Sequence, residues 1–86
     1  MQVLRERHRL SREALKDLLV QLSEEHGLGH IIAWDDFAFK GKAKGTTVQG
    51  EIFEGELHLE VAGWLEKFAV KKFRATWKGL VVQGMV

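Results

Sequence analysis

Four cationic side chains near the end of the sequence are spaced as a helix would place them on one strip: Lys67, Lys71, Arg74 and Lys78. Their intervals of four, three and four residues match the helical period, which predicts a helix over Trp64 to Lys78. Trp64 and Phe68 flank this cationic strip, and the opposite strip is apolar, with Leu65, Ala69, Phe73 and Trp77. A helix of this kind is typical of proteins that contact an anionic or amphiphilic surface. The alternative is a core helix whose charged back only faces water.

Residue types that bind metals or catalyse reactions are present, but their spacing matches no known site. His26 and His30 are close in sequence, yet zinc needs a third or fourth ligand, and only His58 or an unspecified carboxylate is available. Asp35 and Asp36 are adjacent, and neighbouring side chains of a strand point to opposite faces, so a tight turn is the simpler interpretation. No serine lies in a nucleophile elbow. We therefore expect no enzyme, no bound metal and no cofactor.

A glycine- and lysine-containing segment, Gly41 to Gly45, has the composition of a phosphate-binding loop. It lacks the Gly-Lys-Ser/Thr ending, and no helix is expected after it, so the helix dipole that would hold a phosphate is missing. We expect a flexible basic loop that could extend the cationic region of the helix. Nucleic-acid binding is a third hypothesis on this ground, although the phenylalanines that would stack on bases are better explained as core: Phe37, Phe39 and Phe53.

The composition is that of one small globular domain over residues 1–86. Hydrophobic residues make up 45% and charged residues 29% of the sequence, and the formal net charge of +1 gives no overall attraction to nucleic acid or membrane. Any electrostatic attraction must therefore be local. The sequence has no cysteine, no signal peptide and no apolar run long enough to span a bilayer, so we expect a cytoplasmic protein that is not transmembrane.

The first half of the chain predicts a strand and then a helix. Gln2 to His8 mixes apolar and charged residues, which suits a short edge strand. Ser11 is a candidate N-cap, and the helical rhythm that follows ends at His26-Gly27, where glycine can adopt the left-handed conformation that closes a helix. The leucines of this helix are expected to form its inner face: Leu15, Leu18, Leu19 and Leu22.

From His30 to Gly63 the apolar period changes from 3.6 to 2, which predicts antiparallel strands. Ile32 and Trp34 precede a turn at Asp35-Asp36, and Phe37 and Phe39 begin the returning strand. A further hairpin turns at Glu54-Gly55 and ends in Leu57 to Val61, whose alternation gives the sheet one buried and one wet face. Gly50 within the preceding strand, which runs through Thr46, Val48 and Ile52, suggests a bulge or a bend.

The last helix is expected to stop at Gly79, which leaves an apolar tail from Leu80 to Val86. This tail could continue the helix, pair with an exposed sheet edge, or meet its copy in a homodimer.

In this order of elements the chain resembles the polyhydroxyalkanoic acid system family of small bacterial proteins. The resemblance rests on short segments that cover most of the chain in the family's order: His8-Arg9-Leu10, Glu13-Ala14, Trp34-Asp35-Asp36, Phe37-Ala38-Phe39, Gly45 and Leu57-His58-Leu59-Glu60-Val61. It implies a helix-grip-like fold, in which a curved sheet holds a long helix, and an association with storage-polyester granules or their metabolism. It implies no reaction, and it is weakest after Gly79.

The sequence thus predicts an α+β domain in which a curved antiparallel sheet of four to five strands, in the order strand, helix, strands, helix, packs against two helices. The leading hypothesis is a non-enzymatic accessory or binding protein. Its C-terminal helix would engage an amphiphilic surface, a polyester granule or a protein partner through Trp64, Lys67, Phe68, Lys71, Arg74 and Lys78. The alternative is a helix-grip domain that holds a small apolar ligand between the sheet and the last helix, although its bulky inward aromatics are expected to fill that space.

Overall fold

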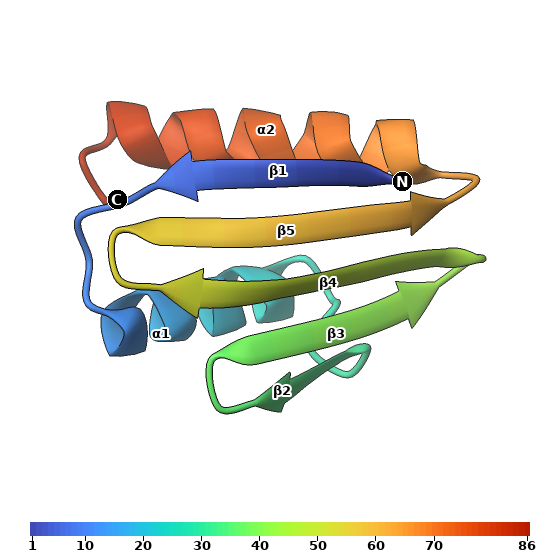
Figure 1. Cartoon of the computed structure of the whole chain (residues 1–86), viewed down its shortest axis with the longest axis horizontal. Helices are drawn as coiled ribbons and strands as arrows, with labels where there is room; N and C mark the ends of the chain where they lie inside the picture. The colour runs from blue at the N-terminus through green and yellow to red at the C-terminus, as the bar shows by residue number, and fades with distance from the viewer.

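Five antiparallel strands form one open sheet, and two helices cover one of its faces (Figure 1). All 86 residues are described by this computed structural model. Along the chain the elements are β1 (Gln2–Arg7), α1 (Arg12–Glu25), β2 (Ile32–Asp35), β3 (Ala38–Ala43), β4 (Thr46–Phe53), β5 (Glu56–Gly63) and α2 (Glu66–Val82). The strand order across the sheet is β1-β5-β4-β3-β2, with β1 and β2 at the edges. The predicted α+β class, element order and N-terminal edge strand are confirmed.

The two faces of the sheet differ as the alternation in β5 predicts. Leu57, Leu59 and Val61 are buried under the helices, while His58 and Glu60 lie on the face that no helix covers. Two groups of buried side chains form the core: Leu15, Ile52, Leu57, Trp77 and Leu80 in one, and Leu4, Leu59, Val61 and Val70 in the other. Both helices therefore pack on the same side, and the opposite side is an open sheet face.

The ends of α1 are set by local chemistry. The Ser11 side chain accepts a hydrogen bond from the backbone N–H of Ala14 at 3.1 Å, which satisfies one of the N–H groups that the first helical turn leaves free. Gly27 has a φ of 72° and closes the other end. Leu15 is fully buried, and the other three leucines of the predicted inner face are partly buried against the same core.

The hairpin between β2 and β3 turns one residue later than predicted. Its turn is Asp36-Phe37 rather than Asp35-Asp36, and Asp36 adopts a φ of 56°, which aspartate tolerates better than most residues. This placement removes Phe37 from the strand and lets its ring pack against the α1 side of the core, with the Arg12 guanidinium 4.4 Å from the ring centroid.

The prediction of a loop over Gly41 to Gly45 was wrong. Residues 41–43 complete β3, paired with β4, and only Lys44-Gly45 forms the connecting turn. Gly41 faces the helices and is buried because the Ile32 side chain fills the space beside it: a Cβ on Gly41 would lie 3.2 Å from Ile32 Cγ1. A small residue at an inward position hides the alternation that identifies a strand.

Gly50 makes no bulge, because the register of β4 with both neighbours is continuous across it. Glycine is needed there for a close approach. A Cβ on Gly50 would lie 2.5 Å from Cζ of Phe39 and 2.6 Å from the backbone oxygen of His58. The Phe39 ring thus occupies the space of the missing side chain, and this ring also packs against Trp34, with ring centroids 4.9 Å apart.

The last helix begins later and ends later than the sequence predicted. Trp64 precedes α2, and the helix continues through Gly79 to Val82, so the first of the three alternatives for the tail is the one observed. Gly84 has a φ of 73° and forms a Schellman motif, in which the N–H groups of Gly84 and Met85 donate to the carbonyls of Val81 and Leu80. The helix continues because Leu80 is buried, which outweighs the cost of about 1 kcal/mol for glycine in a helix.

Candidate functional site

The outward side of α2, together with Trp64 just before the helix, carries all six residues that the sequence singled out. Val70, Trp77 and Leu80 point into the core, as the helical period requires. The six predicted site residues are all exposed: Trp64, Lys67, Phe68, Lys71, Arg74 and Lys78. We call these six the α2 outer surface. Trp64 is 81% exposed and Phe68 66% exposed, so both aromatic rings face solvent in the monomer.

Charge is distributed unevenly over the molecule. α2 contains five cationic residues and one acidic residue, whereas the remainder of the chain contains eight cationic and eleven acidic residues. The one acid, Glu66, is half-buried, and its carboxylate lies 3.2 Å from the amino group of Met1. No acidic side chain therefore belongs to the α2 outer surface. A net charge of +1 conceals a local surface that is strongly cationic.

Apolar side chains continue along this cationic side of the helix. Ala75 follows Phe68 by seven residues and Val82 follows Ala75 by seven, so all three lie on the same exposed strip. Val82 is 78% exposed. The aromatic residues mark the N-terminal end of the strip, Val82 marks its C-terminal end, and lysines lie between them. A helix of this length spans about 25 Å.

Trp64 occupies a corner between β5 and α2, not a helical position. Its Nε1–H donates a hydrogen bond to the backbone oxygen of Lys44 at 2.9 Å, and its ring lies against Gly45. The neighbouring backbone N–H of Leu65 donates to the Thr46 hydroxyl at 3.1 Å, and Thr46 is buried. The turn between β3 and β4 and the start of α2 therefore meet at one end of the molecule (Figure 1).

The sequence reasoning missed this contact. It placed Trp64 inside the helix, and it did not extend β3 far enough to bring Lys44 to the same end of the sheet. The available signal was Gly63, which has a φ of 123° and marks the point where the chain leaves β5.

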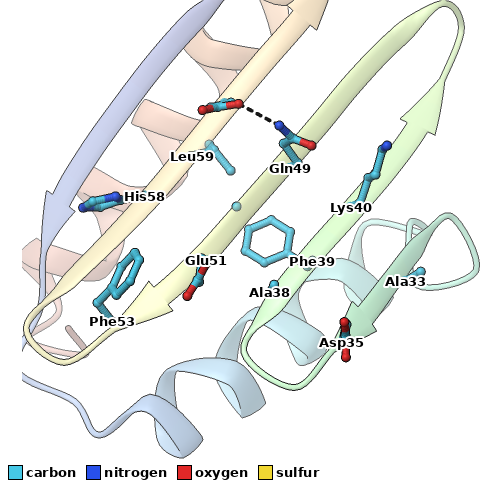
Figure 2. Close-up of a pocket in the computed structure, with 12 residues that line it drawn as sticks. Ala33, Asp35, Ala38, Phe39, Lys40, Gln49, Glu51, Phe53, His58 and Leu59 are labelled. Atoms are coloured by element: carbon cyan, nitrogen blue, oxygen red, sulfur yellow. Dashed lines mark hydrogen bonds between the residues drawn. The ribbon is translucent and has the colours of Figure 1, made fainter.

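The open sheet face contains a shallow hollow of about 520 Å³, which Figure 2 shows between the side chains of β2 to β5. Three of its polar residues have a side-chain partner: Gln49, His58 and Glu60. His58 Nε2 lies 2.9 Å from Glu56 Oε1, and Gln49 Nε2 donates to Glu60 Oε2 at 2.7 Å. The Phe53 and His58 rings are in contact, with centroids 4.6 Å apart. The Gln49–Glu60 and Phe53–His58 pairs join β4 to β5 and are of the kind that stabilises a solvated sheet face, whereas His58 and Glu56 belong to the same strand.

The residues weighed as metal ligands or catalysts are dispersed. His26 and His30 are exposed near the end of α1, and no three histidine or acidic side chains lie close enough together to hold a metal ion. Asp35 ends β2, and Asp36 serves the turn, where its backbone oxygen accepts a hydrogen bond from Lys16 Nζ at 2.7 Å. The turn interpretation of these two carboxylates is confirmed for Asp36 alone.

A second hollow, of about 300 Å³, lies between α1 and the C-terminal part of α2. Its apolar lining includes Leu18, Leu22, Leu80 and Met85. This position differs from the space between the sheet and the last helix, where the ligand-binding alternative would place its pocket. In that space Val70 and Trp77 are buried in contact with residues of the sheet.

Comparisons of the chain with protein families, with curated proteins and with solved structures found no match. The resemblance to the polyhydroxyalkanoic acid system family therefore stays a prediction from the sequence. Neither helix has the length and apolar character that crossing a membrane requires.

Proposed function

We propose that this protein is a binding or accessory protein that attaches to an anionic, amphiphilic surface through the α2 outer surface. The single observation that carries the proposal is the exposure of Trp64 and Phe68 beside a row of cations with no acid among them. Cations supply attraction to negative headgroups, and exposed aromatic and aliphatic groups gain free energy when they leave water.

If the charged side of α2 were only solvated, it would not need these exposed apolar groups. Five of the nine large hydrophobic side chains that are exposed belong to the C-terminal segment: Trp64, Phe68, Val81, Val82 and Met85. Single exposed apolar residues are ordinary, but a concentration of them in one segment of the chain is typical of interaction sites. This distribution favours a docking role over simple solvation.

Pairing of two copies through this surface is disfavoured by charge. Because the α2 outer surface contains four cations and no acid, packing two copies face to face would bring eight cations together. Like charges at an interface cost several kcal/mol. An anionic partner removes this repulsion and uses the same cations as an attraction. The polyester granule that the family resemblance implies is one candidate for such a surface.

Two matched variants test the proposal. The first replaces the four cations of the α2 outer surface with glutamine: Lys67→Gln, Lys71→Gln, Arg74→Gln and Lys78→Gln. The control replaces four exposed cations elsewhere: Arg5→Gln, Arg7→Gln, Arg9→Gln and Lys40→Gln. Both variants change the formal net charge from +1 to −3, since each loses four cations. Only the position of the lost charge differs between them.

Binding is measured by cosedimentation with vesicles that contain phosphatidylglycerol and phosphatidylcholine. Near an anionic surface each Lys or Arg contributes about 1 kcal/mol, so the first variant should bind on the order of 1,000-fold more weakly than the wild type. The control should keep most of its affinity. Equal loss in both variants would show that overall charge, not this surface, causes binding, and the proposal would then be abandoned.

A further inference from the structure

The turn between β3 and β4 carries an unusual residue for its conformation. It has two central residues, Lys44 and Gly45, with φ values of 52° and 74°. Two positive φ values define the type I′ hairpin turn, in which Asn-Gly is the favoured pair. Lysine is strained in this left-handed region, since only glycine, asparagine and aspartate enter it readily. The chain thus keeps a cation at the tip of this turn against the local preference.

This same turn holds Trp64 in place. The Trp64 indole N–H donates to the Lys44 carbonyl at 2.9 Å, and a Cβ on Gly45 would lie only 3.3 Å from Trp64 Cδ1. Behind them Gly63 allows the two chain segments to touch, because a Cβ there would lie 2.4 Å from the Gly45 oxygen. The corner is therefore tightly built, although the ring that it holds is 81% exposed.

We propose that Lys44 extends the contact of the α2 outer surface beyond Trp64 onto the β3–β4 turn, and that the surface they bind is an anionic phospholipid bilayer. The inference rests on the proposed function and extends it to the β3–β4 turn. Trp64 suits the boundary between lipid headgroups and acyl chains, because its only hydrogen-bond donor is already satisfied by Lys44. Its ring can leave water without leaving a polar group unpaired.

A bilayer fits this end of the molecule better than a soluble polyanion does. Lys44 and Lys67 would meet phosphate groups, while Trp64 and Phe68 require an apolar layer directly beneath the charged one. A nucleic-acid duplex or an acidic peptide satisfies the lysines but offers no such layer. The proposed contact also fixes orientation, because it makes the end of the sheet that carries the β3–β4 turn face the membrane together with the start of α2.

The substitution Lys44→Asn separates this role from folding. Asparagine is preferred at this position of a type I′ turn, so the variant should unfold at the same urea concentration as the wild type or at a higher one. The carbonyl that accepts from Trp64 is retained because it belongs to the backbone. Affinity for vesicles that contain phosphatidylglycerol should fall about fivefold, the effect of one cation near the surface. The control, Lys40→Gln, removes an equal charge from the open sheet face and should bind like the wild type.

Quenching by brominated lipid supplies a second measurement. Trp77 is buried and Trp34 is half-buried, whereas Trp64 is exposed. The part of the tryptophan fluorescence that is quenched in the wild type on binding, but not in the Trp64→Phe variant, therefore comes from Trp64. We expect strong quenching of this component. If Lys44→Asn binds with wild-type affinity, the inference is overturned. It is also overturned if the Trp64 fluorescence is not quenched in bound protein. Neither result contradicts the proposed function. Equal affinity for soluble polyglutamate would overturn the bilayer assignment, and no binding to anionic vesicles would overturn both proposals.

Discussion

Replacing two tryptophans of this chain by alanine should have different effects. Trp77→Ala should mainly lower the free energy of unfolding, whereas Trp64→Ala should mainly weaken binding to vesicles. Trp77 is 5% exposed and packs between the two helices and the sheet, with its ring 5.7 Å from that of Phe73. Removing a buried tryptophan costs about 3–5 kcal/mol, a large part of the 5–15 kcal/mol by which a domain is stable. Trp64 is 81% exposed and loses one exposed hydrogen bond, so Trp64→Ala should cost about 1 kcal/mol or less.

For binding the order reverses. If half of the Trp64 side chain, roughly 100 Å², leaves water at a lipid surface, about 25 cal/mol per Å² gives about 2.5 kcal/mol. Trp64→Ala should then weaken vesicle binding roughly 70-fold. Urea unfolding followed by circular dichroism measures stability, and cosedimentation measures binding. If Trp64→Ala lowers the free energy of unfolding as much as Trp77→Ala does, Trp64 is a structural residue and the docking argument loses its basis.

Two further substitutions test the packing. Gly50→Ala should lower the free energy of unfolding by about 1–3 kcal/mol, because its Cβ would meet the Phe39 ring and the backbone oxygen of His58, and a variant as stable as the wild type would refute this close approach. His8→Ala should lower the free energy of unfolding by a similar amount. The buried His8 ring forms a hydrogen bond through Nε2 with the Phe53 carbonyl at 2.9 Å, which links the end of β1 to the β4–β5 hairpin. Protection of the β1 amides from hydrogen exchange should fall in that variant, and unchanged protection would contradict this role.

The features that sequence predicted well depend on residues close together in the chain. Ser11 and Gly27 fix the ends of α1 through contacts within a few residues, and the alternation of β5 directly reports its two environments. The exposure of the helical residues of the α2 outer surface, Lys67 to Lys78, also followed from helical periodicity alone. In each of these cases the neighbours in sequence are also the neighbours in space, so the pattern contains the needed information.

The features that sequence missed depend on partners distant in the chain. Gly41 looked like part of a loop because the side chain that covers it comes from Ile32 on the next strand. Gly79 looked like a helix end because the burial of Leu80, which extends the helix, is decided by the core and not by local propensity. The contact between Trp64 and Lys44 joins residues twenty positions apart. Such contacts appear only once the sheet register is known.

The attachment of the protein to an anionic lipid surface, through the cationic and aromatic side of α2, is the proposal on which the others depend. Its most direct test is the partition of wild-type protein between buffer and vesicles as the phosphatidylglycerol fraction is raised in phosphatidylcholine, at low and at high salt. We predict binding that increases steeply with the anionic fraction and weakens in salt, because the cations of the α2 outer surface are exposed and therefore screened. Binding that is absent at every composition, or that is equal on purely zwitterionic vesicles, would contradict the claim.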